Sequence, residues 1–132
     1  IVLSGLVYLC SLCIFVCICT LYYLYGPPLE DMANVQDVYF HNSDTVFLVA
    51  IASNRVVGTI AIVHRSTTDK TTKVAWLRRM AVLRQFRGLG IAKSLIKEAI
   101  VFSRTHKYSS IELITTEVHK SARNLYERMG FQ

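Results

Sequence analysis

The residues best suited to chemistry lie in one short segment, residues 84–92, which reads Arg-Gln-Phe-Arg-Gly-Leu-Gly-Ile-Ala. Gly88 and Gly90 lack a Cβ atom, so the backbone there can approach a ligand closely. If a helix begins directly after them, its first N–H groups and the positive end of its dipole point at the same place. Residues 78–97 also contain six basic side chains and no acidic one. The segment therefore favours a phosphate or a similar anion as its ligand.

Two glycines separated by one residue are a weak signal by themselves. The segment is not a Walker loop, because no Gly-Lys-Ser/Thr follows, and it is not the dinucleotide fingerprint, because Lys93 stands where the third glycine would be. A plain strand-to-helix turn with a solvated basic face is the alternative interpretation. The secondary structure around the segment is needed to choose between an anion site and a plain turn.

The segment lies between a predicted strand and a predicted helix. Residues 74–83 read as a strand, in which we expect Trp76 to lie in the core. Residues 91–106 repeat apolar side chains at helical spacing. Residues 108–116 read as another strand, so the three elements have the length of a strand–helix–strand crossover with parallel strands. Upstream, residues 45–52 and 56–63 predict an antiparallel hairpin joined by a short polar turn.

Two further helices complete the predicted domain. Residues 121–129 carry apolar side chains on one helical face and are followed by Gly130, which suits the end of a helix. A short amphipathic helix is predicted over residues 31–39. We therefore expect an α/β (α+β) fold, a mixed β-sheet flanked by helices, in a domain large enough to bury its own core.

The first 26 residues differ from the rest because none of them is charged. All 15 Lys and Arg and all 9 Asp and Glu follow Gly26. A helix of this length could cross the roughly 30 Å hydrocarbon core of a bilayer, and Pro27 and Pro28 would end it. The sequence predicts a transmembrane helix over residues 1–26 and a domain over residues 27–132. A cleaved signal peptide and a buried core helix are the alternatives.

The cysteines and the net charge suggest two other functions, a metal or redox site and nucleic-acid binding. The Cys-x-x-Cys spacing fits metal or redox chemistry, but the domain has no cysteine to complete a site, so we expect buried apolar thiols and no metal. The net charge of +6 is compatible with nucleic-acid binding. The basic segment lacks the aromatic interleaving of such modules, so we expect no nucleic-acid partner. All four cysteines lie in the uncharged block: Cys10, Cys13, Cys17 and Cys19.

Two motifs, which occur in the same order as in a known family, give the chain a family resemblance. Residues 85–90, preceded by Met-Ala-Val at residues 80–82, resemble the Gln/Arg-x-x-Gly-x-Gly/Ala motif of the GCN5-related N-acetyltransferase (GNAT) family. Residues 122–131, Ala-Arg-Asn-Leu-Tyr-Glu-Arg-Met-Gly-Phe, are similar to that family's Ala-x-x-Leu-Tyr-Glu-Lys-x-Gly-Phe helix. The resemblance covers roughly residues 31–131. With an uncharged span ahead of it, the chain looks most like the membrane-bound camello-like (N-acetyltransferase 8-like) branch.

The resemblance implies an enzyme that transfers an acetyl group from acetyl-CoA, its co-substrate, to a primary amine. The acceptor would be a small molecule, such as a cysteine conjugate or an amino acid, or a protein lysine. No metal is implied. The branch implies the endoplasmic reticulum membrane, with a single-pass or hairpin anchor. The alternative is a catalytically inactive, membrane-anchored binding protein of the same fold.

The resemblance also implies how acetyl-CoA is bound. The backbone of β-strand residues would pair with the pantetheine arm, and the glycine-containing segment would hold the pyrophosphate. The residues so implied are Met80, Ala81, Val82, Arg84, Arg87, Gly88, Leu89, Gly90, Ile91 and Ala92.

Catalytic roles follow from the same resemblance. Tyr126 would act as the general acid to the leaving thiolate. The general base stays open, because residues 74–83 contain no carboxylate; Glu112, Glu117 and His119 are candidates, with His64 further off. His119 stands where many family members carry an asparagine, and an imidazole titrates nearest neutral pH. Family members also have further C-terminal strands, so we expect the chain to be a fragment whose domain is incomplete at its C-terminus.

Overall fold

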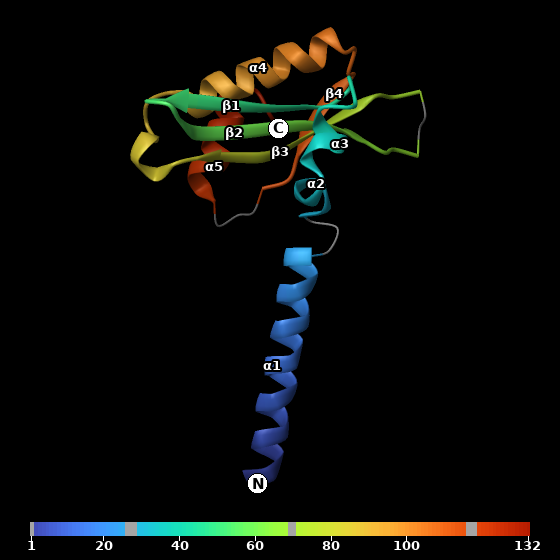
Figure 1. The fold of residues 1–132 in the computed structure, drawn as a ribbon, viewed down its shortest axis with the longest axis vertical. Helices are drawn as coiled ribbons and strands as arrows, with labels where there is room; N and C mark the ends of the chain where they lie inside the picture. Colours follow the sequence, from blue (N-terminus) through green and yellow to red (C-terminus); the bar gives the residue numbers. More distant parts are fainter. Residues whose placement is uncertain (1, 26–28, 69–70, 116–118) are drawn as a thin grey trace. The chain divides into compact units, whose positions relative to one another are not determined.

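The computed structural model describes residues 2–25, 29–68, 71–115 and 119–132 (Figure 1). The chain divides into two compact units, Ile1–His41 and Asn42–Gln132. The predicted helix stop at Pro27 and Pro28, and the predicted domain boundary after Gly26, lie outside the described residues.

The first unit is helical. Helix α1 spans Val2–Tyr25, followed by α2 (Glu30–Ala33) and α3 (Val35–Tyr39). The single helix predicted over residues 31–39 is therefore wrong, since the backbone of Asn34 leaves the helical region at φ −136° and ψ 58°. In α1, the window Val7–Leu24 has a mean hydropathy of 2.2, and none of it is buried. By length and composition, α1 can cross a membrane.

The second unit is built on a four-stranded sheet with the order β1-β2-β3-β4 (Figure 1). The strands are β1 (Val46–Ala52), β2 (Arg55–Arg65), β3 (Val74–Val82) and β4 (Ser110–Leu113). The first two pairs are antiparallel, and β3 and β4 are parallel. The predicted mixed sheet, hairpin and parallel crossover are confirmed.

The hairpin between β1 and β2 is tighter than the sequence suggests. Ala52 pairs with Arg55, so only Ser53 and Asn54 form the turn. Both have positive φ, at 49° and 58°. This left-handed pair is the turn whose twist matches that of the flanking strands.

Helices α4 (Ile91–Thr105) and α5 (Lys120–Arg128) pack on one face of the sheet. Figure 1 shows α4 running along the strands. Successive strand residues point to opposite faces, so one set of alternate residues meets the helices. The buried core comprises Ile60, Ile62, Ala75, Leu77, Leu95, Ile96, Ala99 and Tyr126.

Strand β4 is shorter than the predicted 108–116. Before β4, the Tyr108 hydroxyl donates to the Asp44 carbonyl, and the Ser109 N–H donates to the Lys73 carbonyl. These hydrogen bonds join the start of β4 to the residues just before β1 and β3. The last residue of the prediction, Thr116, lies outside the described residues. Parallel pairing with β4 ends at Leu77 and Leu113, and β3 continues to Val82 paired with β2.

Candidate functional site

Strand β3 contains a bulge just after its pairing with β4 ends at Leu77. Thr59 pairs with Ala81 and Ala61 pairs with Arg78, so two β3 residues lie opposite Ile60. Arg79 adopts φ 55°, and the Thr59 hydroxyl donates to its carbonyl over 2.7 Å. A bulge bends its strand and changes the direction of the residues after it.

Residues 78–82 form the part of β3 that we call the β3 edge. Among the described residues no strand pairs with it on the β4 side, because pairing with β4 covers only residues 74–77. An extended ligand with amide groups can add to such an edge as a strand would. Met80, Ala81 and Val82, predicted to bind the cofactor, lie together on this edge.

The glycine loop, residues 87–92, follows the β3 edge after a short 3-10 turn, Arg84–Phe86. Gly88 and Gly90 have φ of 80° and 81°, and a Cβ added at either would meet nothing within 4 Å. Gly90 is the N-cap of the 15-residue helix α4 and makes no side-chain capping hydrogen bond. The loop thus combines left-handed backbone, open space and a helix N-terminus, which together suit an anion.

The predicted basic residues around the loop differ in their contacts. Arg87 Nε donates to the Val82 carbonyl over 3.0 Å, which ties the loop to the end of β3. Arg84 lies in the 3-10 turn and is exposed. Leu89 is 71% exposed although it is apolar. Ile91 and Ala92 begin α4 and are half-buried.

Gly58 lies beneath the first turn of α4, and sequence reasoning missed it. A Cβ there would lie 3.1 Å from both Ile91 Cγ2 and Leu95 Cδ1, and 3.3 Å from the Ala81 carbonyl oxygen. The glycine therefore lets the first turn of α4 pack directly on β2. The available signal was a glycine inside an apolar strand, which often marks a close approach.

Among the predicted catalytic residues that the structure describes, Tyr126 alone lies in the buried core. It is 8% exposed and contacts Phe131 edge-to-face, with ring centroids 5.7 Å apart. Burial raises the pKa of its hydroxyl above the ordinary 10.0. The hydroxyl is therefore protonated at neutral pH, as a general acid must be.

Glu112 lies on the opposite face of the sheet, paired with Arg65. It is the register partner of Trp76. Trp76 was expected in the core, and this is wrong. It stands between the core residues Ala75 and Leu77 and so points to the other face.

The histidine candidates occupy other positions. His119 is the N-cap of α5, and its carbonyl accepts from the N–H groups of Ala122 and Arg123. His64 lies near the far end of β2, with its ring centroid 6.3 Å from that of Tyr108. Glu117 lies outside the described residues.

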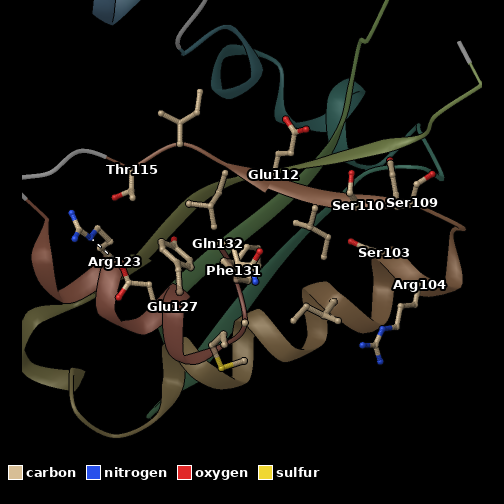
Figure 2. Close-up of a pocket in the computed structure, with 18 residues that line it drawn as sticks. Ser103, Arg104, Ser109, Ser110, Glu112, Thr115, Arg123, Glu127, Phe131 and Gln132 are labelled. Carbon is tan, nitrogen blue, oxygen red and sulfur yellow. Dashed lines mark hydrogen bonds and ion pairs between the residues drawn. The ribbon is translucent and has the colours of Figure 1, made fainter. Parts of the chain in front are cut away.

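A cavity of about 910 Å³ runs along the outer edge of β4, bounded by α4, α5 and residues 129–132. Glu112 and Tyr126 both line it, whereas His119, His64 and the glycine loop do not. Figure 2 shows the Glu112 carboxylate on the opposite side of β4 from Ser103 and Phe131. The structure thus brings the predicted acid, Tyr126, and one of the candidate bases, Glu112, to one cavity.

Comparison with known families gives one match over most of the chain. The model of the family described as "Acetyltransferase (GNAT) family" matches residues 17–131. The chain is 40% identical over 102 residues to N-acetylaspartate synthetase from Danio rerio, covering 77% of this chain and 35% of that protein. It is 31% identical over 141 aligned positions to N-acetyltransferase 8 from Rattus norvegicus, covering 100% of this chain and 64% of that protein. The chain therefore spans about a third of the first relative and less than two thirds of the second.

Solved structures share the fold. An acetyltransferase of the GNAT family from Staphylococcus aureus Mu50 superposes with a TM-score of 0.69 and 28% identity, covering 79% of this chain and 62% of that one. An aminoglycoside N-acetyltransferase in complex with CoA superposes with a TM-score of 0.67 and 18% identity, covering 78% of each chain. At 18% identity, the similarity to the aminoglycoside N-acetyltransferase shows a shared fold alone.

Proposed function

The chain belongs to the acetyltransferase (GNAT) family, and on that premise we propose that it transfers an acetyl group from acetyl-CoA to a primary amine. The observation that carries this proposal is the continuity of the β3 edge with the glycine loop. The β3 edge offers backbone groups to an extended amide-containing arm, and the glycine loop directly after it offers an anion site. Acetyl-CoA has the same order of parts, a thioester-bearing amide arm followed by a pyrophosphate.

Acetyl-CoA would lie along this surface with its phosphates at the N-terminus of α4. Met80, Ala81 and Val82 would pair with the pantetheine amides. Gly88 and Gly90 would leave room for the pyrophosphate, and the α4 dipole would stabilise its charge. Arg84 and Lys93, both exposed beside the loop, would add positive charge.

The thioester would then lie where β3 and β4 separate. We assign Tyr126 as the acid that protonates the thiolate, because burial keeps its proton in place. We assign Glu112 as the first candidate base, because it precedes the last β3–β4 pair by one residue. His119, at the N-cap of α5, is the second candidate base. Strand N–H groups at the bulge would stabilise the developing oxyanion.

The acceptor is proposed to be the amine of a small molecule, an amino acid or a cysteine conjugate, or of a protein lysine. The names of the relatives, N-acetylaspartate synthetase and N-acetyltransferase 8, support an N-acetyl product. Turnover measured with aspartate, cysteine conjugates and lysine peptides tests this. Acetyl-CoA binding without acetylation of any of them would favour the inactive binding protein instead.

We further propose that residues 1–26 anchor residues 27–132 to the endoplasmic reticulum membrane. The length of α1, its hydropathy and its lack of charge support this. Extraction of cell membranes at alkaline pH should leave the protein in the pellet, and microscopy should show the reticular pattern. Release into the soluble fraction would contradict the anchor.

A further inference from the structure

Four side chains on the sheet face opposite the core form a group that we call the indole cluster: Arg65, Trp76, Arg78 and Glu112. The Arg65 Cζ lies 5.8 Å and the Arg78 Cζ 4.5 Å from the ring centroid of Trp76. A guanidinium within about 6 Å of an indole is held by its π-electrons. Arg65 also pairs with the Glu112 carboxylate. The cluster is therefore a charged surface organised around one aromatic ring.

The cluster lies beside the point where β3 and β4 separate. Trp76 pairs with Glu112 in the register, and only the pair Leu77–Leu113 follows before pairing stops. Arg78 is the next β3 residue on the same face, immediately before the bulge. The helices fill the other face with core side chains. The indole cluster therefore lies at the same point along the sheet as the proposed thioester site, on the face opposite the core.

The pair between Arg65 and Glu112 is accessible to water. Their side chains are 41% and 46% exposed, respectively. Ion pairs at this exposure contribute little net stability, because water solvates the separated groups nearly as well. A second carboxylate can therefore replace Glu112 at the Arg65 guanidinium with little loss.

From this geometry, and resting on the proposed function, we propose that Arg65 recognises a carboxylate carried by the acceptor amine. The acceptor's carboxylate takes the place of Glu112 on the Arg65 guanidinium. Glu112 is thereby released to receive a proton from the acceptor's ammonium group. Arg65 and Glu112 thus select acceptors that carry both charges, as a free α-amino acid or a cysteine conjugate does and its carboxamide does not.

The proton balance of the step is complete. The ammonium gives one proton to Glu112, and the neutral amine attacks the acetyl carbonyl carbon, so that a C–N bond forms while the C–S bond breaks. The thiolate takes a proton from Tyr126. The second proton leaves the nitrogen as the amide forms and restores Tyr126 through solvent, and Glu112 later releases its proton to solvent.

Trp76 supplies a direct probe, because the chain contains a single tryptophan. Fluorescence of the full-length protein in detergent is titrated with aspartate, leucine and S-benzylcysteine, each beside its α-carboxamide, without acetyl-CoA. We expect saturable changes with at least one free acid, and binding at least about tenfold weaker for its amide. No saturable change with any compound, or equal affinity for acid and amide, would overturn the proposal.

Two variants with opposite expected effects separate recognition from a structural role. Arg65→Gln should weaken binding of the acid about tenfold and leave the amide unchanged. Glu112→Gln should tighten binding of the acid, because Arg65 loses its internal partner, while lowering turnover. Weaker acid binding in both variants would show a merely structural pair and overturn the proposal. Arg55→Gln, on the same strand, is the matched control, and circular dichroism checks that each variant is folded.

Acetyl-CoA affinity, measured by calorimetry, distinguishes failure of this inference from failure of the proposed function. A protein that does not bind acetyl-CoA contradicts the proposed function whatever the titration shows. Normal acetyl-CoA binding together with equal acid and amide affinities contradicts only the carboxylate exchange at Arg65.

Discussion

The two ends of strand β3 are built in opposite ways. At its carboxyl end, the β3 edge and the glycine loop combine strand backbone that no described strand pairs on the β4 side with two left-handed glycines and open space around them. At its amino end, Lys73 Nζ donates to Asp44 Oδ1 over 2.6 Å and to the His106 carbonyl over 3.1 Å. Lys73 also lies 4.7 Å from the ring centroid of Tyr108, whose hydroxyl donates to the Asp44 carbonyl. We call Asp44, Lys73 and Tyr108 the amino-end clamp.

The contrast shows that polar groups at the two ends of one strand–helix–strand unit have different roles. Polar groups of the clamp bond to each other and join the starts of β1, β3 and β4. Burial, and less strongly the Asp44 charge, raises the pKa of Tyr108 to about 12, so its hydroxyl keeps donating over the physiological range. The glycine loop instead keeps its helix N-terminus without a side-chain cap. We infer that the clamp serves stability and the loop serves binding.

The largest expected effect comes from adding a side chain to the loop. Gly90→Glu places a carboxylate in the open space before α4, where it would compete with and repel phosphates. We expect acetyl-CoA affinity to fall by about 100-fold or more, which corresponds to about 2.7 kcal/mol. Calorimetry measures the affinity, and Gly88→Glu should behave alike.

Gly130→Glu is the matched control for this change. Gly130 also has positive φ, at 93°, and open space around it, but it follows α5. Gly130→Glu should carry the same conformational cost of a side chain at positive φ, and it should keep normal affinity for acetyl-CoA. Equal loss of affinity at both positions would show that backbone strain, rather than the ligand site, explains the effect.

The next effect concerns catalysis. Tyr126→Phe keeps the buried ring and removes the hydroxyl, so turnover should fall by about 100-fold, the lower end for a general acid. Acetyl-CoA affinity should change little. Because burial raises the Tyr126 pKa, the wild-type rate should not fall from Tyr126 ionisation below about pH 10. An unaltered rate in the variant would remove Tyr126 from the mechanism.

At the other end of β3, Lys73→Met should cost stability and leave binding intact. It removes two charged hydrogen bonds, and we expect the free energy of unfolding to fall by about 1–2 kcal/mol. Chemical denaturation measures this, beside an acetyl-CoA affinity that should stay unchanged. A variant that binds acetyl-CoA poorly while remaining folded would break the division between the two ends.

The smallest effect is the pH dependence of the clamp. The hydrogen bond from Lys73, and secondarily its charge, lowers the pKa of Asp44 below 3.8. A carboxyl whose pKa is lower in the folded state stabilises the fold above its unfolded pKa and loses that contribution as pH falls through the folded one. The stability advantage of wild type over Asp44→Asn should therefore be constant above about pH 5 and shrink below pH 3.8. An advantage that persists at lower pH would contradict the ionic contribution of Asp44.

Local patterns predicted much of this molecule from sequence. The glycines before α4, the crossover and the core face of α5 follow from backbone sterics and periodicity, which act over a few residues. The bulge at Arg79 could not be predicted, because an arginine rarely adopts positive φ and contacts distant in sequence, such as the hydrogen bond from Thr59, hold it there. The pair between Arg65 and Glu112 joins residues 47 positions apart, so no local pattern encodes it. Trp76 was misplaced because the sheet has two faces, and periodicity does not say which face the helices cover.

Hydrogen–deuterium exchange of the full-length protein with and without acetyl-CoA tests the division between the two ends most directly. Acetyl-CoA should slow exchange in peptides covering residues 78–94, where the β3 edge and the first turn of α4 lie. Peptides covering Asp44 and Tyr108 of the amino-end clamp, at residues 42–46 and 106–110, should exchange alike in both states. Unchanged exchange at residues 78–94 in the presence of saturating acetyl-CoA would contradict the assignment of this surface as the acetyl-CoA site.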